Sequence, residues 1–172
     1  MKSNNLLSIA IHIVIIISIQ ILLFLNLSFT IFDKYSLVLF IVPLTVMILP
    51  ISYPKATVLT IAFIIGLFID YFYQSLGLHA SSLVLIAFAR PYILSVIEPR
   101  GGYRTDKTLS SSSYGMSWFL SYSAILLILY LLVYFSLDAF SLVYIDKILV
   151  NALLSFIASY VVVCTYQFVV RA

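Results

Sequence analysis

Two ionisable residues lie inside long apolar stretches of this 172-residue chain, and an ionisable group there is a candidate for function. Asp70 lies near the end of one stretch, and Arg90 lies within the next, beside Pro91. On membrane-insertion scales a charge at depth costs on the order of 3 kcal/mol. Simpler interpretations stay open, because Asp70 is one turn from Tyr73 and interfacial water, and Arg90 has a side chain long enough to reach the headgroups.

The spacing around Asp70 places small residues beside the acid. Ala62, Gly66, Asp70 and Tyr73 follow one another at intervals of four, four and three residues, so they share one face of a helix. Small residues on such a face allow a neighbouring helix to approach closely. We therefore expect the carboxylate to face a neighbouring helix and not lipid.

On the following stretch Arg90 shares a helical face with Glu98. The two residues are about 12 Å apart along a regular helix axis. A direct or water-mediated pair is expected only if a kink at Pro91 brings the side chains together.

Other polar residues in apolar stretches are interpreted as groups that satisfy one another or hold a partner helix. Asn151, Ser155 and Ser159 form a stripe with a spacing of four, and His12 and Gln20 lie toward one side of the first stretch. His79 is placed in a loop, with no cluster of cysteines or carboxylates around it. No catalytic residue, metal site or cofactor is predicted.

The composition identifies the elements that carry these residues. The chain is 64% hydrophobic and 9% charged, whereas a soluble domain has roughly 25% charged residues. Together with a mean hydropathy of +1.20 this predicts an all-α integral membrane protein. One domain, residues 1–172, is expected, with six spans over about 6–27, 36–51, 56–73, 80–97, 116–137 and 142–170. The second is expected to be kinked or tilted, since it contains Pro43 and ends at Pro50.

Charge distribution then predicts the orientation. Only Lys34 and Lys147 fall on one side of this topology. The other side carries seven basic residues: Lys2, Lys55, Arg90, Arg100, Arg104, Lys107 and Arg171. By the positive-inside rule both termini are expected in the cytoplasm. The polar stretch from Glu98 to Ser113 becomes a basic cytoplasmic loop, with Arg100, Arg104 and Lys107 either touching lipid headgroups or docking a partner.

A resemblance covers about the forty residues from Gly66 to Tyr103. The run Gly66-Leu67-Phe68-Ile69-Asp70, continuing through Leu76-Gly77-Leu78-His79-Ala80, resembles the signature of the bacterial rod shape-determining MreD family. Further along, Phe88-Ala89-Arg90-Pro91 and Ile97-Glu98-Pro99-Arg100-Gly101-Gly102-Tyr103 resemble the version found in Bacteroidetes-type members.

The resemblance implies a non-enzymatic, multi-pass subunit of the cell-elongation (Rod) complex in the bacterial cytoplasmic membrane. It implies a fold similar to the substrate-binding (S) components of energy-coupling-factor transporters. The implied partners are the bitopic protein MreC, the MreB filament and the peptidoglycan synthases. Carried over by position, the family-like residues are Gly66, Asp70, Gly77, Arg90 and Pro91. Our hypothesis is that Gly66 and Asp70 help to shape a site for MreC.

Two other classes of function stay open at this stage. A small-molecule carrier of the S-component type shares the implied fold, and fold does not determine function. Its pocket would need convergent polar and aromatic groups, of which the stretch 71–79 offers a few. A membrane enzyme would need acids, histidines or basic residues clustered at one interface. The six acids are instead scattered along the chain.

Overall fold

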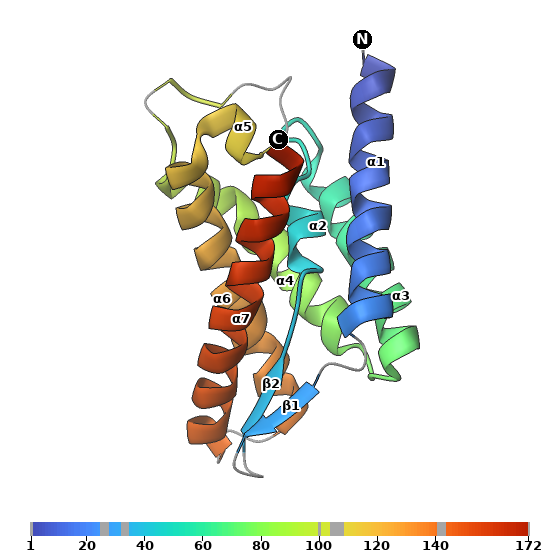
Figure 1. Cartoon of the computed structure of the whole chain (residues 1–172). Helices are drawn as coiled ribbons and strands as arrows, with labels where there is room; N and C mark the ends of the chain where they lie inside the picture. Colours follow the sequence, from blue (N-terminus) through green and yellow to red (C-terminus); the bar gives the residue numbers. More distant parts are fainter. Residues whose placement is uncertain are drawn as a thin grey trace.

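The computed structural model describes residues 2–24, 28–31, 35–99, 101–103, 109–140 and 144–171, and most of them are helical. The order of elements is shown in Figure 1. It is α1 (Lys2–Ile19), a π-helical turn η1 (Gln20–Phe24), β1 (Ser28–Ile31), β2 (Tyr35–Val38), α2 (Pro43–Met47), α3 (Lys55–Tyr73), α4 (Leu78–Val96), α5 (Ser111–Tyr114), α6 (Met116–Ala139) and α7 (Ile145–Arg171).

Within the described residues, four helices are long and apolar enough to cross a membrane: α3, α4, α6 and α7. This confirms the predicted helical membrane protein in its coarse form, and the bounds of these helices lie within three residues of those expected. The first predicted span corresponds to α1 and η1, in which the apolar part, Leu7–Leu22, is shorter.

The prediction of a helix over residues 36–51 is wrong. This stretch begins as β2, continues as extended chain, and then forms only the five-residue helix α2. Pro43 has no N–H to donate to a preceding turn, so it starts a helix here and does not continue one. The structure also adds a two-stranded antiparallel sheet to the predicted all-helical class, in which Ser28 pairs with Val38 and Ile31 with Tyr35.

The extended chain lies inside the molecule and α7 satisfies its amides. Ser36 N–H donates to Asn151 Oδ1 (3.1 Å), Val38 N–H to Ser155 Oγ (3.0 Å) and Phe40 N–H to Ser159 Oγ (2.9 Å). Two residues of strand rise about 6.6 Å and four residues of helix about 6 Å, so the two spacings match. The residues of the polar stripe were expected to satisfy one another or to hold a partner helix, and they hold an extended backbone instead.

Gln20, in η1, satisfies the same segment from another side. Its Nε2 donates to the carbonyl oxygen of Leu39 (3.1 Å), and its Oε1 accepts the N–H of Ile41 (2.8 Å). A non-helical backbone at membrane depth is tolerated only where protein groups or water satisfy it. Here the side chains of Gln20 and of α7 make the hydrogen bonds that this backbone needs.

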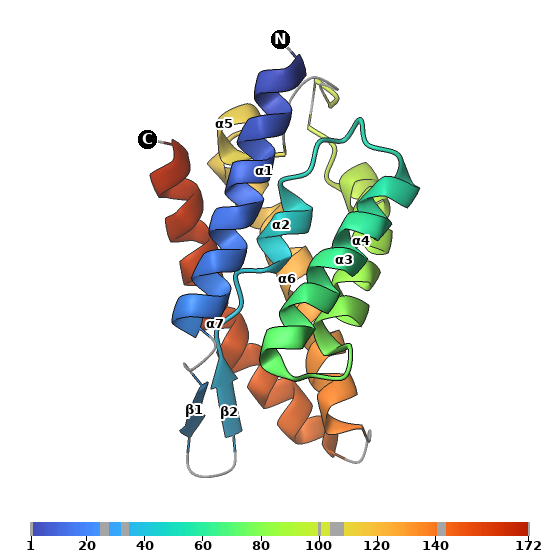
Figure 2. The ribbon, with the colours of Figure 1, turned by 90° about the vertical axis from the view of Figure 1, so that its right-hand side faces the viewer.

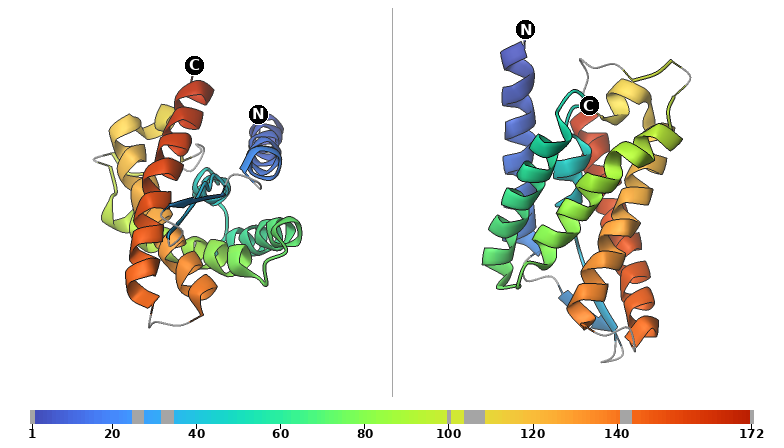
Figure 3. Two further views of the ribbon diagram at one scale, coloured as in Figure 1. Left: turned by 60° about the horizontal axis from the view of Figure 1, so that its bottom comes forward. Right: turned by 180° about the vertical axis from the view of Figure 1, so that it is seen from behind.

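α2 occupies the centre of the bundle. Figure 3 (left) looks obliquely along the bundle and shows α2 surrounded by α1, α3, α4, α6 and α7, and Figure 2 shows it behind α1 and α3. Every residue from Phe40 to Pro50 is buried. Both chain ends lie at one end of the bundle and the β1–β2 sheet at the other, as Figure 1 shows.

Candidate functional site

The turn between α3 and α4 brings the family-like residues of the first motif together. α3 ends at Tyr73, Gln74 adopts a left-handed conformation (φ 52°), and Gly77 does the same (φ 83°) just before α4 begins. A side chain at Gly77 would strain this backbone. Gly77 also precedes α4 without any side chain of its own to cap the first N–H groups of the helix.

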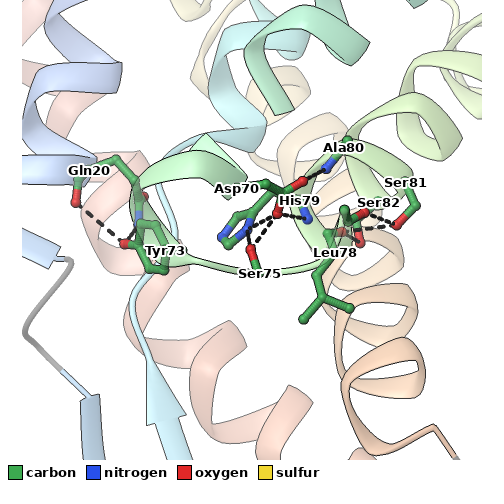
Figure 4. A network of polar contacts seen from close by, with 10 residues as sticks. Gln20, Asp70, Tyr73, Ser75, Leu78, His79, Ala80, Ser81 and Ser82 are labelled. Carbon is green, nitrogen blue, oxygen red and sulfur yellow. Dashed lines mark hydrogen bonds and ion pairs between the residues drawn. The ribbon is translucent and has the colours of Figure 1, made fainter. Parts of the chain in front are cut away.

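Asp70 of α3 provides the missing cap. Its Oδ2 accepts the backbone N–H of Ala80 (2.9 Å), and its Oδ1 accepts that of His79 (2.9 Å). Oδ1 also accepts the Ser75 hydroxyl (2.5 Å) and lies 3.0 Å from His79 Nδ1. Figure 4 shows the carboxylate between the two helices. A carboxylate at a helix N-terminus is favoured both by the free amides and by the helix dipole.

Gly66 allows α3 and α4 to approach closely enough for this cap to form. A Cβ built on Gly66 would lie 2.3 Å from the Cα of Ala80 and 2.7 Å from its backbone nitrogen. These are backbone atoms, so no side-chain rotation would relieve the overlap. Gly66 and Asp70 therefore both face α4, as the spacing predicted for the acid. We call Gly66, Asp70, Ser75, Gly77 and His79, together with the Ala80 backbone, the α3–α4 latch.

His79 differs from the sequence-based expectation, because it lies in the first turn of α4 and is completely buried. Its ring packs against those of Tyr73 (4.7 Å between centroids), Tyr134 (5.0 Å) and Phe40 (5.7 Å). An ionised carboxylate only accepts hydrogen bonds, so Nδ1 is assigned as the nitrogen that donates to Asp70. The other nitrogen, Nε2, is buried with no partner among the described residues.

Arg90 lies in a second polar site, between α4, α6 and the end of α2. Its Nε donates to the Tyr122 hydroxyl (3.1 Å), and its Nη2 donates to the carbonyl oxygen of Leu49. Tyr122 donates in turn to the carbonyl oxygen of Met47 (3.2 Å). The guanidinium and the Tyr122 hydroxyl thus supply donors to carbonyl groups at the C-terminal end of α2, where a positive charge is favoured.

A cavity of about 320 Å³ opens beside Arg90. Its polar lining residues are Tyr53, Lys55, Arg90, Ser95, Glu98 and Tyr103, and Pro91 belongs to its apolar part. Burial raises the pKa of Tyr103 to about 12, so its hydroxyl stays protonated and donates to the carbonyl oxygen of Leu94 (2.8 Å). Arg90 and Glu98 line the same cavity, but among the described residues they form no ion pair within 4.0 Å.

The structure therefore separates the predicted site residues into two groups. Gly66, Asp70 and Gly77 belong to the α3–α4 latch, and Arg90 and Pro91 belong to the cavity. Arg100, Arg104 and Lys107 lie outside the described residues.

Sequence reasoning missed the partners of both ionisable residues. For Asp70 a signal was present: an acid near the C-terminal end of a helix is disfavoured by the dipole of that helix. A short turn ending in glycine brings the N-terminus of the next helix beside it, which reverses the preference. For Arg90 the acceptors are backbone carbonyl groups of Leu49 and a tyrosine from α6, and no spacing in the sequence relates them.

Comparisons with known proteins assign no family to the chain. No protein-family model matches it, and no curated protein or solved structure matches it significantly.

Proposed function

We propose that this chain is a non-enzymatic subunit of the cell-elongation machinery, as its resemblance to the MreD family implies. In this proposal the protein is a multi-pass protein of the bacterial cytoplasmic membrane with both termini inside the cell. It binds the bitopic protein MreC and helps to couple MreB filaments to the peptidoglycan synthases. The second passage through the membrane is the interior segment formed by β2 and α2, and not a regular helix.

The observation that supports this most is the role of the family-like residues. Gly66, Asp70 and Gly77 build the α3–α4 latch, and Arg90 holds the end of α2. Asp70 is 4% exposed and both of its oxygens accept hydrogen bonds. A signature whose members organise the fold suits a protein that acts by presenting helices to partners.

The hypothesis about MreC changes in one respect. Gly66 packs against the backbone of α4 and the Asp70 carboxylate accepts its N–H groups, so neither residue is available to contact MreC directly. They would support MreC binding by setting how α3 and α4 lie together, while the partner touches other atoms of this hairpin.

Depletion in the source organism, with cell shape as the readout, tests the proposal. Loss of rod shape is expected, together with recovery of MreC when the tagged full chain is purified in mild detergent. Gly66→Ala is expected to lower both complementation and MreC recovery, because its methyl group would separate α3 from α4. Gly101→Ala is the matched control, since a Cβ there meets nothing within 4 Å among the described residues. Unchanged shape after depletion, with no MreC in the eluate, would rule the proposal out.

The carrier function keeps one supporting observation. A cavity of about 260 Å³ lies between the ends of α6 and α7 that are far from the chain termini, and Asp138, Tyr144, Lys147 and Asn151 contribute its polar lining. Asp138 and Lys147 would offer a small polar ligand one negative and one positive charge. Thermal melting of the purified chain with a panel of vitamins separates the two functions: a saturable upward shift favours the carrier, and no shift favours the scaffold.

A further inference from the structure

The cavity beside Arg90 contains a buried cation without a counter-charge. Arg90 is 4% exposed, and no carboxylate of the described residues lies within 4.0 Å of it. Its two hydrogen bonds use Nε and Nη2, so Nη1 has no partner among those residues. Neutral oxygens satisfy donors but do not cancel the charge, and an uncompensated buried charge is costly.

The rest of the cavity adds groups that favour an anion. Lys55 lines it and also lies over the Tyr92 ring, with Nζ 5.7 Å from the ring centroid. The Tyr53 hydroxyl is a further lining group that can donate, whereas the Ser95 and Tyr103 hydroxyls already donate to the carbonyl oxygens of Tyr92 and Leu94. Glu98 is exposed and is the one acid of the lining, so the cavity carries an excess of one positive charge.

The volume and position of the cavity narrow the class of ligand. Small-molecule sites begin at about 300 Å³, and this cavity reaches that size. It is bounded by the α2–α3 connection, the C-terminal end of α4 and residue 103, at the same end of the bundle as both chain termini (Figures 1 and 2). The end of a membrane bundle is where phospholipid headgroups lie, and basic pockets between helices bind them.

We propose that this cavity binds a phosphate group through Arg90 and Lys55. The phosphate neutralises the Arg90 guanidinium and accepts hydrogen bonds from Nη1, from Lys55 and from the Tyr53 hydroxyl. Its position makes an anionic phospholipid headgroup the favoured source, and a soluble phosphate compound has the same binding chemistry. This site is separate from the α3–α4 latch and does not depend on the proposed function.

The test uses the purified full chain with Lys55→Gln as the main variant. Arg90 is left unchanged, because it also holds the end of α2. Lys147→Gln is the matched control, since this lysine lines the cavity at the far end of the bundle. A second variant, Ser95→Leu, fills the cavity from an exposed position and removes no charge.

Three probes distinguish the sources: short-chain phosphatidylglycerol, diacylglycerol with the same acyl chains but no phosphate, and inorganic phosphate. Binding is followed by native mass spectrometry and by the fluorescence of Trp118, the single tryptophan, which contacts Tyr103 (5.9 Å between ring centroids) at the cavity wall. We expect phosphatidylglycerol to bind and diacylglycerol not to bind. Loss of one charge-assisted contact should weaken binding about tenfold in Lys55→Gln.

The outcomes decide between the possibilities. Retention of diacylglycerol equal to that of phosphatidylglycerol would overturn the proposal, and so would equal affinities of wild type, Lys55→Gln and Ser95→Leu. Weakening in both cavity variants but not in Lys147→Gln supports it. Binding of inorganic phosphate that depends on Lys55, without any preference for the phospholipid, would keep the phosphate site and assign a soluble ligand to it.

Discussion

Asp70 lies in one helix and caps the next one. Its carboxylate accepts the N–H groups of His79 and Ala80 at the start of α4, where Gly77 offers no side chain. An acid inside a membrane protein is usually considered first as part of a transport or proton pathway. Here its two oxygens are engaged in joining two helices, and the price of burying the charge is offset by four hydrogen bonds.

Asp70→Ala should destabilise the protein strongly. It leaves two buried amides, the Ser75 hydroxyl and His79 Nδ1 without their acceptor, and we expect a loss of about 3 kcal/mol. The measurement is the fraction of folded, monodisperse protein in detergent as temperature rises. Asp146→Asn is the control, because Asp146 is exposed in the first turn of α7. Equal melting of wild type and Asp70→Ala would contradict the assigned cap.

At the scale of elements, an extended strand and a helix are joined in register. Ser36 and Val38 of β2 and Phe40 just after it, each separated from the next by one residue, donate to three helix residues with a spacing of four. A strand inside a helical bundle otherwise has unpaired amides along its length. The side chains of Asn151, Ser155 and Ser159 replace the neighbouring strand that a sheet would supply.

The double variant Ser155→Ala/Ser159→Ala tests this arrangement. The N–H groups of Val38 and Phe40 lose their acceptors, and each unsatisfied buried amide costs about 1–3 kcal/mol. We expect a lower melting temperature in detergent and faster amide hydrogen exchange at Val38 and Phe40. Thr165→Ala is the control on the same helix, since Thr165 is exposed and bonds only within α7. Exchange rates that stay as slow as in the wild type would refute the role of these serines.

At the scale of the whole molecule, both chain ends lie together at one end of the bundle (Figure 1). The interior segment β2–α2 leads the chain from the sheet, at the far end of the bundle, back to the α2–α3 connection at the end where the termini lie. A segment that is only partly helical can therefore carry the chain across without changing the side on which the termini lie. Together with the charge asymmetry, this arrangement leads to a prediction of sidedness.

Cysteine labelling tests the sidedness. In a Cys164→Ser background, Leu76→Cys, at a fully exposed position of the α3–α4 turn, should react with an impermeant maleimide added to intact cells. Gly101→Cys, in the connection after α4, should react only after the membrane is permeabilised. The opposite pattern would show that the termini face outward.

Four long helices and the inward-facing acid could be predicted from the chain because each depends on local information. Membrane helices follow from the length and apolarity of a stretch, and the spacing of Gly66 and Asp70 places both on one face. The wrong prediction of a helix over residues 36–51 also came from relying on local apolarity. The hydropathy of that stretch measures burial, and a buried strand and a buried helix are equally apolar.

By itself the sequence determined that the chain has the character of a membrane protein and where its four long helices run, and it predicted that Asp70 faces another helix. Only the tertiary structure decided what Asp70, Arg90 and the α7 stripe bind. Each of them binds backbone N–H or carbonyl groups, which almost every residue possesses and which therefore leave no mark in the sequence. Which of these groups remain unpaired depends on where helices end and strands run, and that is settled only when the elements pack together.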